Sequence, residues 1–98
     1  MNLLRKNRPK IKVEIYSKPD CHLCDEAKAL LVKIQKEIPF EISEVDITQH
    51  AALFEEFKEQ IPVVFINGRK AFKYHVDESE FRKRILRDPW PLRFTRLK

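Results

Sequence analysis

The fold is decided by a stretch in which a strand-like segment runs into two cysteines: Ile11-Lys12-Val13-Glu14-Ile15-Tyr16-Ser17-Lys18-Pro19-Asp20-Cys21-His22-Leu23-Cys24. Apolar side chains occupy every second position of its first half, a period of two that predicts a β-strand ending near Ser17. Pro19-Asp20 interrupts this pattern, and from His22 onward the apolar residues follow the helical period. The cysteines are therefore predicted to lie where a strand gives way to a helix.

The next elements are predicted from the same two spacings of apolar residues, the strand period and the helix period. The first helix is predicted to continue to Ile38, because Pro39 stops it. A second short strand is expected within residues 40–47, and Thr48 or Gln49 is expected to open a second helix. The apolar face of that helix is predicted from Ala52, Leu53, Phe54 and Phe57.

The last third of the chain contains a hairpin and a capped helix. Pro62–Ile66 is a β-branched run typical of a strand buried on both faces. Asn67-Gly68 is a strong signal for a two-residue turn, and residues 71–74 form the return strand. Asp77 is a suitable N-cap for a final helix, with Glu80 three residues later. The apolar side of this helix is predicted to continue through Phe81, Ile85 and Leu86.

The element order is β-α-β-α-β-β-α, which predicts an α/β fold. The first βαβ unit requires a parallel strand pair with a right-handed crossover, and the hairpin adds an antiparallel pair. A four-stranded mixed sheet with helices on both faces satisfies both requirements.

The net charge of +5 is concentrated at the two ends of the chain. Residues 1–10 carry +4 and residues 81–98 carry +6, whereas the residues between them sum to −5. Basic tails bind phosphate backbones or anionic surfaces in some proteins, but more often they are solvated. We expect a basic N-terminal tail at 1–10, one domain at 11–87 and a basic C-terminal extension at 88–98. A nucleic-acid partner is not expected, although binding through the tails remains an alternative.

The chain lacks the long apolar segments that membranes require. Its longest apolar run, Ile61–Ile66, has six residues, and a membrane-spanning helix needs about 20. The first residues contain no apolar region of the signal-peptide type. The expectation is a cytoplasmic monomer without a membrane partner.

The two cysteines are predicted to be chemically active rather than structural. A helix N-terminus stabilises a thiolate, because unpaired amide N–H groups converge there. Cys21 is therefore the predicted attacking sulfur, and Cys24, one turn deeper, is the predicted resolving thiol. A structural zinc site needs four ligands, and the chain offers one Cys-x-x-Cys pair and three scattered histidines. No metal and no iron–sulfur cluster is expected.

The motif resembles the active-site approach of glutaredoxins. The likeness rests on Tyr16–Cys24, and the continuation Cys24–Lys28 is closer to a divergent group of short glutaredoxin-like proteins. It includes Ile61-Pro62, which matches the cis-proline position of the thioredoxin-like fold. The resemblance implies that fold and a thiol–disulfide oxidoreductase active in electron transport and cell redox homeostasis. Reduced glutathione is the implied recycling co-substrate, and no bound cofactor is expected.

The resemblance also suggests binding residues around the dithiol. By the family pattern, the backbone of Ile61 beside Pro62 pairs with glutathione or with a disulfide-containing protein substrate. Lys18 is a candidate for a glutathione carboxylate, Asp77 for its amino group, and His22 for electrostatic tuning of the cysteines. Tyr74-His75-Val76 stands where glutaredoxins usually have a Gly-Gly pair. The alternative function is a catalytically weak or inactive binding module whose substrate groove is narrowed there.

Overall fold

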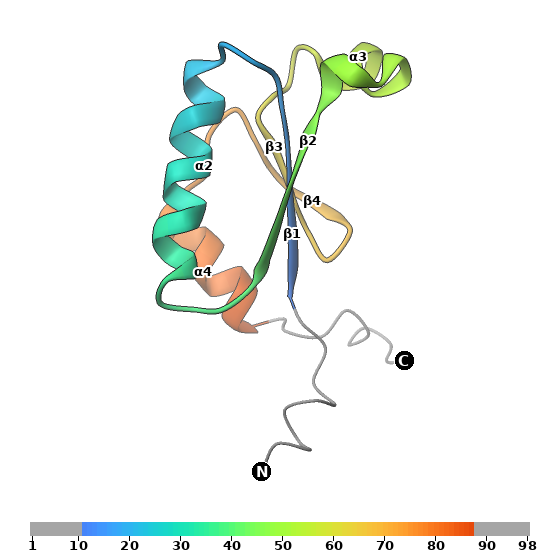
Figure 1. Cartoon of the computed structure of the whole chain (residues 1–98). Helices are drawn as coiled ribbons and strands as arrows, with labels where there is room; N and C mark the ends of the chain where they lie inside the picture. The colour runs from blue at the N-terminus through green and yellow to red at the C-terminus, as the bar shows by residue number, and fades with distance from the viewer. Residues whose placement is uncertain (1–10, 88–98) are drawn as a thin grey trace, which may run out of the picture.

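The computed structural model describes residues 11–87 (Figure 1). The two predicted tails, 1–10 and 88–98, lie outside the described residues, and so does Pro89-Trp90-Pro91. The elements follow the predicted order, with one additional 3-10 turn. They are β1 (Lys12–Ser17), α2 (His22–Gln35), β2 (Glu41–Asp46), η1 (Ile47–Gln49), α3 (Ala51–Phe57), β3 (Val63–Ile66), β4 (Arg69–Lys73) and α4 (Glu78–Arg87).

The four strands form one mixed sheet in the order β2-β1-β3-β4. β1 pairs with β2 in parallel and with β3 antiparallel, and β3 pairs antiparallel with β4. Asn67 and Gly68 make the predicted two-residue turn, with φ angles of 50° and 84°. This turn requires a positive φ at both positions, which explains why the only glycine of the chain is placed there.

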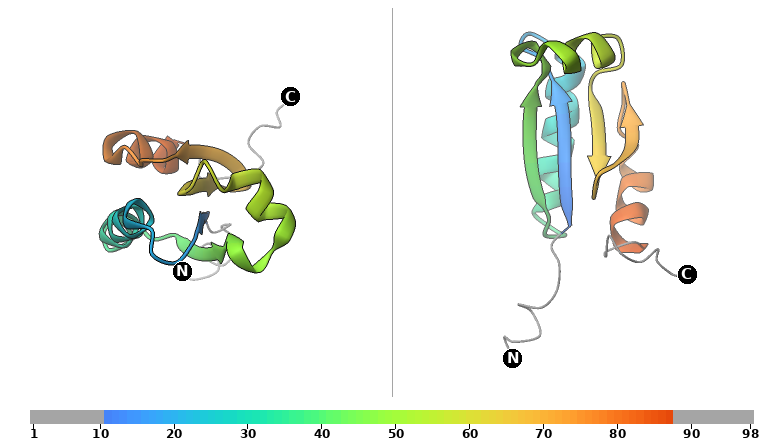
Figure 2. Two further views of the ribbon diagram at one scale, coloured as in Figure 1. Left: turned by 90° about the horizontal axis from the view of Figure 1, so that it is seen from above. Right: turned by 90° about the vertical axis from the view of Figure 1, so that its right-hand side faces the viewer.

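Helices cover both faces of the sheet, as predicted. Figure 2 shows α2 and α4 side by side on one face and α3 on the other, near one end of the strands. The first face holds the larger apolar cluster, to which β1, β3, α2 and α4 contribute side chains such as Ile15, Leu31 and Phe81. The second face holds a smaller cluster that includes Cys24, Phe57 and Ile61. The cysteine pair therefore lies beside the smaller cluster.

Several boundaries and packing details differ from the sequence predictions. The helix predicted to reach Ile38 ends at Gln35, and the N–H of Glu37 bonds back to the Ile34 carbonyl at 2.9 Å in a tighter turn. The helix therefore ends three residues earlier than predicted. The restriction that Pro39 places on the residue before it accounts only for the loss of Ile38. The prediction that Leu86 belongs to the apolar side of α4 is wrong, because this side chain is 63% exposed.

The start of the second helix also differs. Thr48 and Gln49 belong to the 3-10 turn η1, not to α3, and the Asp46 carboxylate accepts the backbone N–H of Thr48 at 2.9 Å. His50 then adopts an extended conformation before α3 begins at Ala51. Ala52, predicted on the apolar face of this helix, is exposed, while Phe57 is buried.

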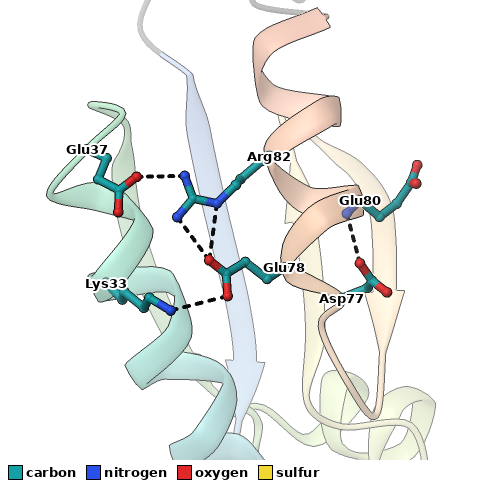
Figure 3. A network of polar contacts seen from close by, with 6 residues as sticks. All are labelled: Lys33, Glu37, Asp77, Glu78, Glu80 and Arg82. Atoms are coloured by element: carbon teal, nitrogen blue, oxygen red, sulfur yellow. Dashed lines mark hydrogen bonds and ion pairs between the residues drawn. The ribbon is translucent and has the colours of Figure 1, made fainter.

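A network of charged side chains joins α2 to α4 (Figure 3). The Arg82 guanidinium donates to the Glu78 carboxylate at 2.9 and 3.2 Å and to the Glu37 carboxylate at 2.8 Å. Lys33 on α2 approaches the second Glu78 oxygen at 3.3 Å. The Arg82–Glu37 and Lys33–Glu78 contacts link α4 to α2 and to the segment that follows α2. No helix within residues 11–87 is long and apolar enough to cross a membrane.

This network predicts a pH-dependent contribution to stability. Hydrogen bonds from Arg82 hold the pKa values of Glu37 and Glu78 below their ordinary value of 4.5. Because the folded pKa is depressed, the stabilisation is present above pH 4.5 and is lost as the pH falls through the folded values. We expect Arg82→Met to lower the free energy of unfolding at pH 7 and to have a smaller effect below about pH 4.

Denaturant unfolding of the wild type and Arg82→Met across this pH range measures the effect. Lys83→Met is the matched control, since Lys83 lies on the same helix and is exposed. An Arg82→Met effect that is the same at every pH would contradict the assignment.

Candidate functional site

The candidate site begins at the end of β1. Ser17 closes the strand, and Lys18, Pro19 and Asp20 form an exposed loop leading to Cys21. Asp20 has a φ of 57°, a left-handed conformation that aspartate tolerates better than most residues. This turn reverses the chain so that Cys21 enters α2, as seen where β1 meets α2 at the top of Figure 1.

Cys21 is the N-cap residue of α2. Its backbone is extended, and its Sγ accepts the backbone N–H of Cys24 at 3.1 Å. The Cys21 carbonyl accepts the N–H of Asp25 at 3.0 Å, which begins the helical ladder. One of the amide hydrogens that a helix leaves unpaired at its start thus points at this sulfur.

The two cysteines form a disulfide, with their Cα atoms 5.2 Å apart. Cys24 is completely buried, whereas Cys21 is only partly buried. The disulfide therefore has one sulfur at the surface and one inside. An attacking thiol must be accessible, which Cys21 is in part; the attacking and resolving roles of the two cysteines stay predictions.

Ile61, the residue before Pro62, lies in the same apolar cluster as Cys24. The Ile61-Pro62 peptide bond is cis, as predicted. Cys21 packs against that cluster. The fold thus brings together the two motifs, about forty residues apart, on which the resemblance rests.

The other predicted site residues are not brought into contact with the sulfurs. His22 is 87% exposed, and its Nε2 lies 3.0 Å from the Glu26 carboxylate one turn along α2. Lys18 is exposed and forms no hydrogen bond or ion pair through its side chain with any residue within 11–87. Asp77 caps α4 by accepting the N–H of Glu80 at 2.9 Å, which confirms its predicted capping role (Figure 3).

A polar cluster beneath the start of α2 was not found by sequence reasoning. The hydroxyl of Ser17, which is 1% exposed, donates to the Glu44 carboxylate at 2.9 Å, and Lys28 donates to the same oxygen at 2.8 Å. The hydrogen bond from Lys28 lowers the pKa of Glu44, and the same bond raises the pKa of Lys28. These residues are far apart in the sequence and share no local motif. The register of the β1–β2 pairing is what brings Glu44 close to α2.

Within residues 11–87, no group of three or more histidine, cysteine or acidic side chains is arranged to hold a metal ion. The chemistry that the arrangement offers is that of the dithiol. It consists of one accessible sulfur at a helix N-terminus and one buried sulfur within bonding reach.

Comparisons with known proteins agree with this arrangement. Residues 12–86 match the family described as Glutaredoxin-like domain. A glutaredoxin-like protein from Dictyostelium discoideum is 30% identical over 80 residues, covering 76% of this chain and 74% of that protein. Protein Ne2328 from Nitrosomonas europaea, solved by NMR, has a TM-score of 0.69 at 26% identity, covering 78% of this chain and 92% of that one. The thioredoxin of Fasciola hepatica, 22% identical, has a TM-score of 0.57 over 88% of each chain. The fold is thioredoxin-like, as the sequence predicts.

Proposed function

Because the chain belongs to the glutaredoxin-like domain family, we propose that it is a thiol–disulfide oxidoreductase whose dithiol is Cys21 and Cys24. The observation that carries the proposal is the position of the Cys21 sulfur at the N-cap of α2, where it accepts the Cys24 N–H. Amide hydrogens and the helix dipole favour the thiolate over the thiol, and the thiolate is the nucleophile.

The proposed reaction has two exchange steps. The Cys21 thiolate attacks one sulfur of a substrate disulfide, so a mixed disulfide forms while the substrate bond breaks, and the departing thiolate takes a proton from solvent. Cys24 then loses its proton and attacks the Cys21 sulfur, which forms the intramolecular disulfide and releases the second substrate thiol. The substrate gains two electrons and two protons, and the protein becomes oxidised.

Recycling requires an external reductant, and glutathione is the one we propose. Two glutathione thiols reduce the Cys21–Cys24 disulfide and leave as glutathione disulfide, so the cycle balances. The Ile61 backbone beside the cis-proline is the proposed pairing site for the substrate chain, because it lies in the cluster that contacts both cysteines. Protein disulfides are the alternative substrates of the same step.

The test is the pH dependence of alkylation of Cys21 in the reduced Cys24→Ala variant. An ordinary cysteine has a pKa of about 8.5, and thiols at helix N-termini fall to roughly 3.5–7.5. We expect a midpoint within that lower range, and a midpoint near the ordinary value in the same variant unfolded by denaturant. Identical midpoints in the folded and unfolded states would overturn the proposal.

The carboxylate of Asp20, which directly precedes Cys21, leads to a second prediction. Asp20 is exposed, and a nearby negative charge raises a thiol pKa. Asp20→Asn is expected to lower the alkylation midpoint by about half a pH unit. Asparagine also tolerates a positive φ, so the loop conformation is retained.

Glu80→Gln is the control for this change, because it also removes one negative charge but on α4, where the Glu80 carboxylate lies 3.9 Å from Arg84 of the same helix. The same titration at low salt measures both variants. A midpoint that rises in Asp20→Asn, or that falls equally in the two variants, would contradict a local effect of Asp20.

A further inference from the structure

The two ends of the domain differ in charge. The dithiol lies at the end where β1 meets α2, and the two tails are attached at the opposite end, where β1 begins and α4 ends (Figures 1 and 2). At the dithiol end, segments 18–26 and 46–59 together carry seven acidic and two basic residues. The opposite end, which we call the basic end, presents five exposed cations: Lys12, Lys36, Arg69, Lys83 and Arg87.

The charge of the basic end is not neutralised within the domain. None of its five cations has an ion-pair partner among residues 11–87. The acids nearby are engaged elsewhere, since Glu37 and Glu78 pair with Arg82 and Lys33 (Figure 3), and Glu41 also has a partner. The five cations are therefore available to an anionic partner.

Two exposed aliphatic side chains lie at the same end. Val32, in the last turn of α2, is 47% exposed, and Leu86, in the last turn of α4, is 63% exposed. Lys36 follows Val32 by four residues and Lys83 precedes Leu86 by three, spacings that place each pair on one helix face. Mixed basic and aliphatic side chains suit the boundary between anionic headgroups and acyl chains, where both kinds find partners.

The tails contain the same two kinds of residue. Residues 1–10 carry a charge of +4 and include Leu3 and Leu4, and residues 88–98 carry +2. From Trp90 onward, large apolar residues alternate with or adjoin basic ones, and tryptophan is enriched at membrane–water interfaces. Because both tails are attached at the basic end, a membrane bound there is within reach of each.

We propose that the basic end is a peripheral binding surface for an anionic lipid membrane. Its cations contact the headgroups, Val32 and Leu86 enter the upper part of the acyl layer, and the dithiol faces away from the membrane. The surface lies apart from the dithiol, so the inference is independent of the proposed redox function. Peripheral binding requires no long apolar segment, so the lack of one, which led us to expect no membrane partner, does not bear on it.

Nucleic acids offer the same phosphate charge, but the apolar groups of the basic end favour a membrane. Proteins that bind single strands stack bases on aromatic side chains. Among residues 11–87, the large apolar side chains exposed at the basic end are aliphatic, and the exposed aromatic side chain, Tyr74, lies near the start of β3 at the dithiol end.

Flotation of the full chain with lipid vesicles tests the inference. The vesicles contain phosphatidylcholine and phosphatidylserine in a ratio of about 7:3, and pure phosphatidylcholine is the neutral comparison. The variant Lys36→Gln/Lys83→Gln removes two cations from the basic end and leaves the tails intact. Lys58→Gln/Lys73→Gln is the matched control, because it removes two exposed lysines at the dithiol end. Circular dichroism checks that both variants fold.

We expect the wild type to bind anionic vesicles at least about tenfold more tightly than neutral ones. A lysine near an anionic surface contributes about fivefold in affinity, so the basic-end variant should bind roughly twentyfold more weakly. The control should stay within about threefold of the wild type. Leu86→Gln should weaken binding about fivefold, and the loss should persist at about 0.5 M salt, where charge attraction is screened.

Three results would overturn the inference. The first is no flotation of the wild type with anionic vesicles. The second is an equal effect of the basic-end and control variants, or no effect of either, because binding would then depend on the tails or on total charge. The third is binding to a single-stranded RNA of about 20 nucleotides without binding to vesicles, which would assign the basic end to nucleic acid.

Discussion

Cys21→Ser is expected to lower the rate of disulfide reduction by more than about a thousandfold, because it removes the nucleophile. A serine hydroxyl at the same N-cap position still accepts the Cys24 N–H, so α2 should keep its start and the fold should be unchanged. The measurement is glutathione-dependent reduction of bis(2-hydroxyethyl) disulfide, with circular dichroism as the check on folding.

Removal of Cys24 is expected to give a different result. The attack by Cys21 should persist, and with glutathione disulfide as substrate and no added reduced glutathione the reaction should stop at the mixed disulfide, detected as an added mass of one glutathione. Cys24→Ala is the better variant here, since Cys24 is completely buried among apolar side chains and a serine hydroxyl would lack a partner. Equal residual activity in the Cys21 and Cys24 variants would contradict the assignment of separate roles.

Phe81→Ala is expected to have the largest effect on stability, about 3–5 kcal/mol. The Phe81 ring is completely buried in the larger apolar cluster and packs edge-to-face on Phe40, with ring centres 5.5 Å apart. The ring of Phe72 lies 6.2 Å away. Small domains have a total stability of about 5–15 kcal/mol, so this one change could remove a large share of it. Denaturant unfolding of the full chain measures the loss.

Leu86→Ala provides the matched control for Phe81→Ala. Both residues lie on α4, but Leu86 is 63% exposed, and a surface change of this type costs within about 0.5 kcal/mol. If the two variants lose similar stability, α4 does not pack on the sheet through Phe81. A thiol pKa measured in Phe81→Ala should match the wild type while the variant is folded, because the ring lies in the cluster that excludes Cys24.

Elements whose signals lie within a few residues were predicted well. The Asn67-Gly68 turn, the β1 strand and the Asp77 cap depend on local backbone preferences, and the structure contains all three. The predicted end of α2 was less accurate than these, because the point at which a helix ends depends on how the chain returns to the sheet. The 3-10 turn at Ile47–Gln49 was missed, although its cap, Asp46, directly precedes it and is a local signal.

Contacts between distant segments could not be predicted from these patterns. Ser17, Lys28 and Glu44 meet because β1 and β2 pair in one register, and a shift by one residue would turn Glu44 to the opposite face. The positive φ of Tyr74 had no sequence signal, because that conformation is normally marked by glycine. The Tyr74 N–H donates to the Gln60 and Pro62 carbonyls, and these two hydrogen bonds stabilise the conformation.

The sequence by itself determined the layout of the candidate dithiol: a cysteine at the N-cap of a helix, a second cysteine one turn later, and a proline directly before a buried strand. These features follow from short-range rules of helix capping, periodicity and turn formation. The tertiary structure decided which sulfur is buried, which side chains surround the dithiol, and that Ser17 and Lys28 meet at Glu44. Such contacts depend on strand register and on packing summed over the whole chain, and no short segment encodes them.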